Sequence, residues 1–129
     1  MKKFILLLPF LILFASCTTT YQSKATFPAA DDLFITSGDG DITKPYTPVG
    51  QFIFMKSGFR IPLPLLGYLN MWDVDPDEVL KTEVYRKIRE MGGDGLINMK
   101  ISWTPPKDGI VGLGANGGYV LITGTVINR

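Results

Sequence analysis

The stretch Asp75–Thr104, DPDEVLKTEVYRKIREMGGDGLINMKISWT, decides the fold, because a helix pattern and a strand pattern meet in it. Asp75 can supply a capping oxygen, Pro76 suits the first helical position, and Glu78 follows three residues after the cap. Acidic side chains also interact favourably with the positive end of a helix dipole. The pattern predicts a helix that begins at Pro76, with a capping pair between Asp75 and Glu78.

An apolar stripe extends this helix to about Met91. Its members, spaced by four, four and three residues with Val79 beside them, are Leu80, Val84, Ile88 and Met91. Gly92 and Gly93 then provide a typical helix end. Two ion pairs are expected on the exposed side of the helix, Glu83–Lys87 and Arg86–Glu90.

Four segments have strand character: Leu33–Thr36, Val49–Phe59, Gly95–Thr104 and Tyr119–Ile127. In the third, four apolar residues alternate with polar ones and should share a buried face: Ile97, Met99, Ile101 and Trp103. Gly124 predicts a bulge or a close backbone approach in the last strand. The order is β-β-α-β-β, and the short connections favour an α+β fold with a four-stranded, mainly antiparallel sheet and one packed helix.

The segment Ile61–Trp72, IPLPLLGYLNMW, is strongly apolar, yet its prolines and glycine prevent a regular helix. One interpretation is a loop that folds over one end of the core. The other is an exposed apolar surface that touches lipid or protein, since contiguous exposed apolar patches usually mark interaction sites. The candidate residues of such a surface are Leu63, Leu65, Leu66, Tyr68 and Trp72.

The N-terminus has the three parts of an export signal. Met1–Lys3 carries two positive charges, and Phe4–Ala15 is an apolar run too short to span a bilayer as a helix. The small residues Ala15 and Ser16 then lead directly into Cys17, the one cysteine of the chain. A secreted domain stapled by disulfides would have an even number of cysteines, so Cys17 needs another explanation.

This N-terminus resembles the lipobox of bacterial lipoproteins, although Phe14 stands where that family prefers leucine. The resemblance implies that residues 1–16 are a signal peptide removed by a peptidase, and that Cys17 carries a diacylglycerol and further acylation such as palmitate. Two or more acyl chains give stable anchoring. Thr18, rather than an acidic residue, follows the cysteine, which resembles the pattern sorted to an outer membrane. The expected location is therefore the cell envelope, in the outer rather than the inner membrane.

Composition limits what the mature protein can do. Removing residues 1–16 from the 129-residue chain leaves 113, enough for a flexible tether over 17–30 and a single domain over 31–129. The 13 basic side chains lose two with the signal peptide, leaving 11 against 12 acidic ones, which argues against nucleic acid as a partner. Histidine is missing from the whole sequence, so most nucleophilic triads and transition-metal sites are excluded. We expect no enzyme, no cofactor and no metal.

Two alternatives remain open. A small-molecule or ion-binding periplasmic domain would need a pocket with converging polar groups, drawn from Asp73, Asp94 and the glycine-rich connection Lys107–Gly118. A hydrolase would need two carboxylates with separated pKa values. Convergence of Asp73, Asp94 and Asp108 in one pocket would discriminate between these classes. The acidic run Asp73–Glu78 has some calcium-like spacing, but Pro76 and the missing glycine favour helix capping instead.

The junction Met91–Met99, MGGDGLINM, resembles the helix–Gly-x-Asp-x–strand turn of several small bacterial envelope and YbjQ-like α/β families. The resemblance covers about 25 residues within Asp75–Thr104. It implies assembly through sheet edges. The metal binding attributed to some of these proteins does not transfer, because this chain offers neither histidine nor a free thiol. We expect a non-catalytic, membrane-anchored envelope lipoprotein that works by binding or assembly, with a protein partner or self-association beside the membrane itself.

Overall fold

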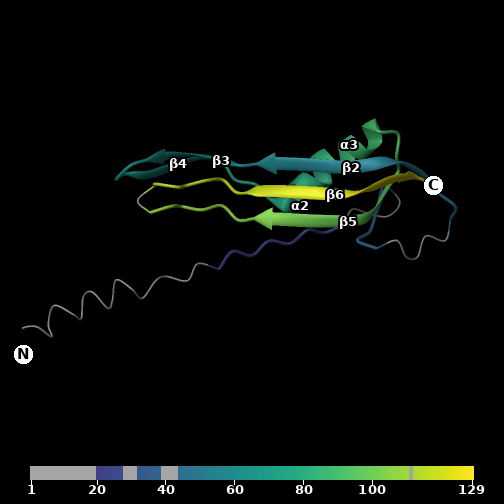
Figure 1. Ribbon diagram of the computed structural model, residues 1–129, viewed down its shortest axis with the longest axis horizontal. Coiled ribbons are helices and arrows are strands. Elements are labelled where there is room, and N and C mark those ends of the chain that lie inside the picture. The colour runs from purple at the N-terminus through teal and green to yellow at the C-terminus, as the bar shows by residue number, and fades with distance from the viewer. Residues whose placement is uncertain (1–19, 28–31, 39–43, 111) are drawn as a thin grey trace, which may run out of the picture.

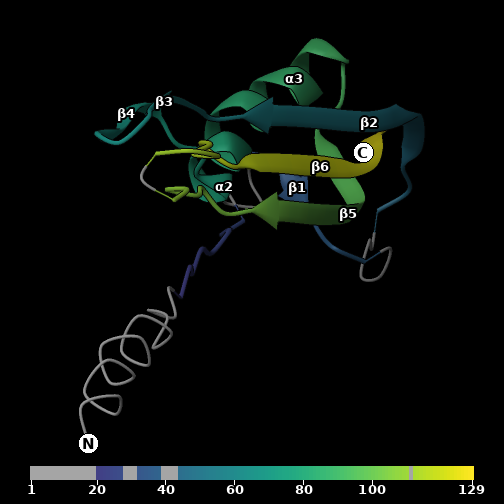
Figure 2. The same cartoon turned by 60° about the vertical axis from the view of Figure 1, so that its left-hand side comes forward.

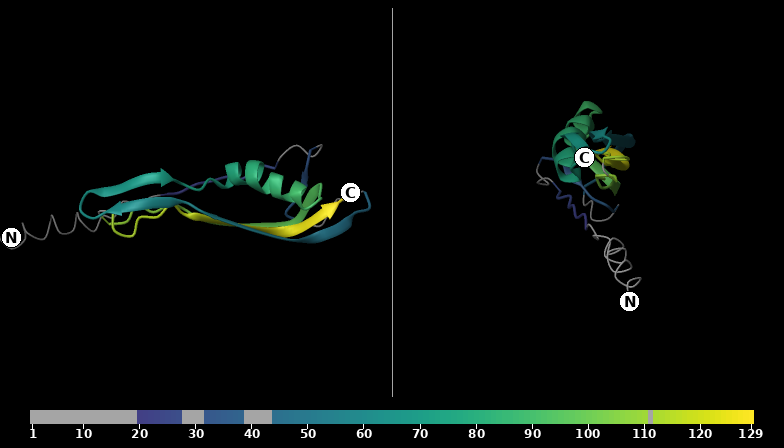
Figure 3. Two further views of the ribbon diagram at one scale, coloured as in Figure 1. Left: turned by 90° about the horizontal axis from the view of Figure 1, so that it is seen from above. Right: turned by 90° about the vertical axis from the view of Figure 1, so that its left-hand side faces the viewer.

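The computed structural model describes residues 20–27, 32–38, 44–110 and 112–129. The expected signal peptide, residues 1–16, and Cys17 lie outside these described residues, as does part of the expected tether 17–30. The described part contains a mixed four-stranded sheet, one helix across a face of that sheet, and a separate two-stranded hairpin (Figures 1 and 3). The prediction of an α+β fold with one helix is confirmed, whereas the strand order and pairing differ in detail.

The larger sheet has the strand order β1-β5-β6-β2. Its strands are β1 (Phe34–Ile35), β2 (Thr47–Ser57), β5 (Gly95–Thr104) and β6 (Tyr119–Asn128). β6 pairs antiparallel with both β2 and β5, but β1 pairs parallel with β5, so the sheet is mixed. Although β1 and β2 are neighbours in sequence, they lie at opposite edges of the central pair and do not form a hairpin.

One continuous helix runs across the sheet as α2 (Pro76–Val79), a π-helical turn η1 (Leu80–Val84) and α3 (Tyr85–Glu90). Asp75 caps it as predicted, since its Oδ1 accepts a hydrogen bond of 3.0 Å from the backbone N–H of Asp77. Glu78 makes no reciprocal capping bond among the described residues. The helix ends at Glu90, and Gly92, two residues further on, has a φ of +82°, a left-handed conformation that favours glycine.

The helix stripe meets the sheet in the core, where Leu80, Val84 and Ile88 are fully buried. The core cluster is completed by ten buried side chains: Leu33, Ile35, Phe52, Val74, Val79, Leu96, Met99, Val120, Ile122 and Val126. Met91 was expected on this stripe, but it is 37 % exposed and lies near Gly50 of β2. The reason is that the helix has already ended there, so the stripe no longer continues.

Two details of the strands differ from simple alternation. Asn98 has a φ of +52° and lies in a β-bulge between Ile97 and Lys100. The extra residue shifts the phase, so Leu96 and Met99 face the core cluster whereas Ile97 is buried outside it. The predicted close backbone approach at Gly124 is confirmed, because a Cβ there would lie 3.0 Å from the carbonyl oxygen of Ile97 and 2.9 Å from a methyl group of Leu96.

The expected ion pairs of the helix are found in part. Arg86 pairs with Glu90 at 2.7 Å, as predicted. Glu83 pairs with Lys56 of β2 instead of Lys87, and Lys87 joins Glu90 at 2.9 Å. Proximity of the helix to β2 provides the closer cation, which spacing along the helix could not show.

The segment Ile61–Trp72 is not an irregular loop, because it belongs to a β-hairpin of β3 (Phe59–Leu63) and β4 (Gly67–Trp72). Pro62 stands within β3, opposite Tyr68. Proline is tolerated in this position since each strand of a two-stranded sheet is an edge strand, so one N–H per pair of residues needs no partner. The reading as a loop over the core was wrong.

Candidate functional site: an apolar arm with a charged base

The hairpin β3–β4 and the glycine-rich loop 105–118 lie side by side and project beyond the end of the four-stranded sheet (Figures 1 and 2). We call these two segments, 59–72 and 105–118, the arm. The loop folds back on itself, with bridges between Lys107 and Asn116 and between Ile110 and Leu113. It touches the hairpin so closely that a Cβ at Gly112 would lie 1.5 Å from the carbonyl oxygen of Gly67.

The end of the arm is apolar and exposed. Leu65 and Leu66, in the hairpin turn, are 84 % and 85 % exposed, and Ile110 in the neighbouring loop is 82 % exposed. Leu113, also exposed, pairs with Ile110. We call Leu65, Leu66, Ile110 and Leu113 the tip. Sequence patterns singled out Leu65 and Leu66 but not Ile110 and Leu113. The signal that could have revealed them is the presence of two large aliphatic side chains within a glycine-rich loop.

The other residues predicted for an interaction surface lie elsewhere on the arm. Leu63 is half-buried in β3. Tyr68 is also half-buried, because the guanidinium of Arg60 lies over its ring, 4.6 Å from the centroid. Trp72 is half exposed at the base of the hairpin, where its ring centroid lies 5.5 Å from that of Phe59. The five predicted residues therefore share the arm, but only two of them form its tip.

A buried arginine holds the base of the arm together. Arg60 is 8 % exposed and donates from Nε and one terminal nitrogen to both carboxylate oxygens of Asp73, at 2.7 and 2.6 Å. Its other terminal nitrogen donates to Asp108 at 2.5 Å. Asn70 adds a hydrogen bond of 3.2 Å to Asp73. The hairpin, the link to the helix and the glycine-rich loop thus meet at one cation, and the sequence did not single out Arg60.

The electrostatics of this cluster favour a structural role. The hydrogen bonds from Arg60 lower the pKa of Asp73 against the opposing effect of burial, and the two carboxylates raise the pKa of Arg60. The Asp108 carboxylate, as a hydrogen-bond acceptor, raises the pKa of Tyr68. A general acid needs a carboxyl group with a raised pKa, whereas Asp73 is held as an anion.

The three carboxylates whose convergence would mark a pocket do not all meet. Asp73 and Asp108 share Arg60, but Asp94 lies at the other end of β5, where it accepts a bond of 3.0 Å from the backbone N–H of Arg129. In the part of the chain that the structure describes, no group of three or more metal-ligating side chains is found. The acidic run before the helix is divided among separate partners, with Asp77 bound by Lys81 at 2.6 Å.

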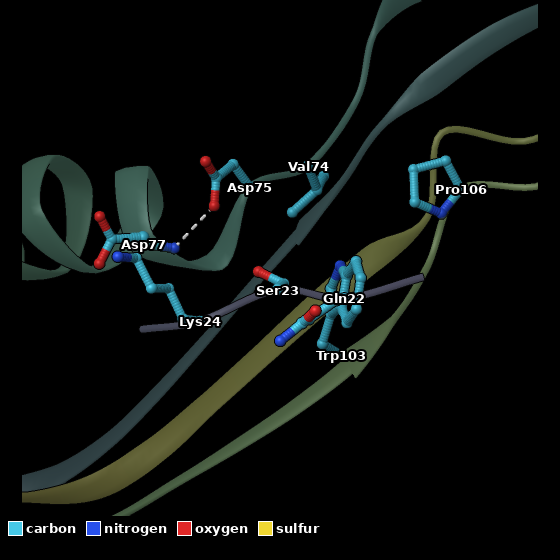
Figure 4. Close-up of a pocket in the computed structure, with 8 residues that line it drawn as sticks. All are labelled: Gln22, Ser23, Lys24, Val74, Asp75, Asp77, Trp103 and Pro106. Carbon is cyan, nitrogen blue, oxygen red and sulfur yellow. Dashed lines mark hydrogen bonds between the residues drawn. The ribbon is translucent and has the colours of Figure 1, made fainter. Parts of the chain in front are cut away.

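A cavity of about 370 Å³ lies at the start of the helix, beside the segment 22–24 (Figure 4). Asp75 and Asp77 line one side, and Trp103 lines another. The indole Nε1 of Trp103 is buried and has no acceptor among the described residues. Thr26 lies next to this cavity, where its backbone N–H and its hydroxyl both donate hydrogen bonds of 2.7 Å to Asp77. The expected tether is therefore docked on the domain at this residue.

A second hollow, of about 400 Å³, runs between the outer edge of β2 and the end of the helix. It is lined by Phe52 and Phe54 of β2 and by Lys87, Glu90 and Met91 around the end of the helix. The charges of Lys87 and Glu90 are already paired with one another. None of the described helices is long and apolar enough to cross a membrane.

No family model matches this chain, and no curated protein matches it. A search of solved structures found the crystal structure of a protein of unknown function from Pediococcus pentosaceus, assigned to the DUF74 family. The two chains are 19 % identical, with a TM-score of 0.42, and the match covers 74 % of this chain and 96 % of the other.

Proposed function

We propose that this protein is a lipid-anchored component of the bacterial cell envelope that is held in the membrane through Cys17 and acts by binding rather than catalysis. The two lysines, the short apolar run and the sequence Ala15-Ser16-Cys17 support the anchor. The observation that carries the binding role is the arm, whose tip exposes large aliphatic side chains on an ordered hairpin. Exposed apolar surface of this kind is typical of interaction sites.

The chemistry of the described residues supports binding over catalysis. Asp73 and Asp108, the two carboxylates that meet at one residue, both form an ion pair with Arg60. The carboxylates with a shifted pKa, Asp73, Asp77 and Glu90, are all shifted downward by neighbouring cations. An acid–base pair in a hydrolase would need one carboxyl group whose pKa is raised well above that of the other. A small-molecule or ion site built on Asp73 and Asp94 is likewise disfavoured by their separation.

Replacement of the anchoring residue tests the first part of the proposal. Cys17→Ser should abolish incorporation of labelled palmitate and leave uncleaved precursor or protein released from the membrane, because serine offers no thiol for the diacylglycerol. Thr19→Ser, a conservative change two residues away, should be labelled like the wild type. Equal labelling of Cys17→Ser and the wild type would show that the anchor is wrong.

A further inference from the structure

We infer that the tip of the arm inserts into the surface of the same bilayer in which Cys17 is anchored. The inserting side chains are Leu65, Leu66, Ile110 and Leu113. This inference rests on the proposed lipid anchor and assigns a second membrane contact, made by the folded domain itself. Its partner is a lipid surface rather than another protein.

Charge is distributed along the arm as membrane insertion requires. Neither 61–72 nor 109–118 contains a charged residue. The nearest charges, Arg60, Asp73, Lys107 and Asp108, lie at the base and sum to zero. Leu63, the last residue of β3 before the turn, comes three residues after Arg60. At about 3.3 Å per strand residue the charged layer therefore lies roughly 10 Å behind the turn that carries the tip. That distance is close to the roughly 5–10 Å to which interfacial elements are buried in the headgroup region.

The polypeptide that leads to the anchor runs toward the arm. Thr26 is bonded to Asp77 at the start of the helix, whereas Gln22 lies near Pro106 at the base of the arm. The segment 20–27, purple in Figures 1 and 3, follows this direction in both views. From residue 27 back to residue 20, the chain therefore runs toward the end of the molecule that carries the tip.

The lengths on the two sides are compatible with one membrane plane. Cys17 lies five residues before Gln22, a reach of at most about 17 Å for an extended chain. Ile110 lies four residues beyond Pro106, roughly 13 Å along the arm. The acyl chains on Cys17 and the tip can consequently meet the same bilayer without any change in the fold.

The turn conformation gives an independent reason to connect Leu65 with a function. Its φ is +69°, in the left-handed region where a Cβ is unfavourable and where glycine or asparagine is usual. Leu65 is also 84 % exposed, so burial in the domain does not offset that cost. Leucine at this position therefore costs free energy twice, once through the left-handed backbone and once through the exposure of an apolar side chain to water. Insertion into lipid supplies the favourable apolar contact that the domain does not.

A probe experiment on the full lipidated protein tests the inference. Acylation of Cys17 would leave no free thiol, so Ile110→Cys can be labelled with an environment-sensitive fluorophore and the protein reconstituted in phosphatidylethanolamine–phosphatidylglycerol vesicles. The matched control is Ile53→Cys on β2, an isoleucine that is 71 % exposed but lies on the open face of the sheet, away from the arm. We expect a blue-shifted emission and at least threefold stronger quenching by a lipid-borne quencher at position 110 than at 53.

Each outcome has a distinct meaning. Equal, weak quenching at positions 110 and 53, in protein that floats with the vesicles, would overturn the insertion and leave the proposed anchor intact. A blue shift at 110 without lipid quenching, accompanied by self-association in detergent, would overturn it in favour of contact between two copies of the chain. Failure of both labelled proteins to float with vesicles would instead show that the lipid anchor itself is wrong.

Discussion

The double substitution of Leu65 and Leu66 by serine tests whether these side chains form an exposed tip or instead stabilise the fold. About one sixth of each residue is shielded from solvent in the domain, as judged from exposures of 84 % and 85 %. Full burial of a leucine side chain contributes roughly 1.5–3 kcal/mol. The two residues should therefore contribute together less than about 1 kcal/mol to the free energy of unfolding, in proportion to the buried fraction.

The assay is urea unfolding of the chain that begins at Thr18, which retains every buried core side chain from Leu33 to Ile127. Leu80→Ser, the same chemical change at a fully buried helix position, provides the matched control and should cost at least about 2–5 kcal/mol. Binding to anionic vesicles is measured on the same proteins and should weaken at least tenfold in the double variant. A loss of several kcal/mol in that variant would refute the reasoning, because it would mean that the two leucines stabilise the fold.

Three further outcomes are expected. Gly112→Ala should destabilise the arm by more than Gly114→Ala, because both have a φ near +80° but only the former would clash with the hairpin; limited proteolysis within 59–72 reports the difference, and equal protection would contradict it. Asp75→Ala should cost about 1 kcal/mol and Ile88→Ala about 2–5 in chemical denaturation, with a harmless Ile88→Ala as the contrary result. The lowered pKa of Asp73 stabilises the fold above its unfolded value of 3.8, so the stability difference between wild type and Asp73→Asn should shrink as pH falls below that value, and a constant difference would argue against the ion pair.

Local signals in the sequence were sufficient for the elements of the core. The helix begins at Pro76 and ends at Glu90, within one residue of the predicted end, because capping and glycine termination act over a few neighbouring residues. The strands β5 and β6 follow from alternation and from β-branched composition. These features depend on interactions between residues close together in the chain, so the sequence alone was enough to predict them.

The hairpin was missed for a reason that concerns proline. Pro62 and Pro64 were weighed as residues that break structure, which holds for a helix and for the interior of a wide sheet. In the two-stranded arm Pro62 still occupies a place in β3, opposite Tyr68. Whether a proline interrupts a strand depends on how many neighbours that strand has, and that number is a property of the tertiary fold.

The charged cluster at the base of the arm was predicted only in part, for a related reason. Asp73 and Asp108 were singled out, but Arg60 was not, and their contacts join residues 13 and 48 positions apart. Topology alone brings the three together, because the hairpin and the glycine-rich loop must first lie side by side. Asp94 is of the same residue type, yet it lies at the opposite end of β5.

The narrow connection between the arm and the sheet, at Gly58 and Gly117, has a consequence for how the arm can change in length. Gly58 and Gly117 approach so closely there that a Cβ at Gly58 would lie 2.3 Å from the carbonyl oxygen of Gly117. Backbone hydrogen bonds and the Arg60 cluster make the connection, and none of the described residues in 59–72 and 105–118 belongs to the core cluster. Insertions or deletions in steps of two residues, which preserve the alternation of faces, would lengthen or shorten the arm without repacking the domain. The reach of the tip is therefore an adjustable dimension, open to selection or to design independently of the rest of the fold.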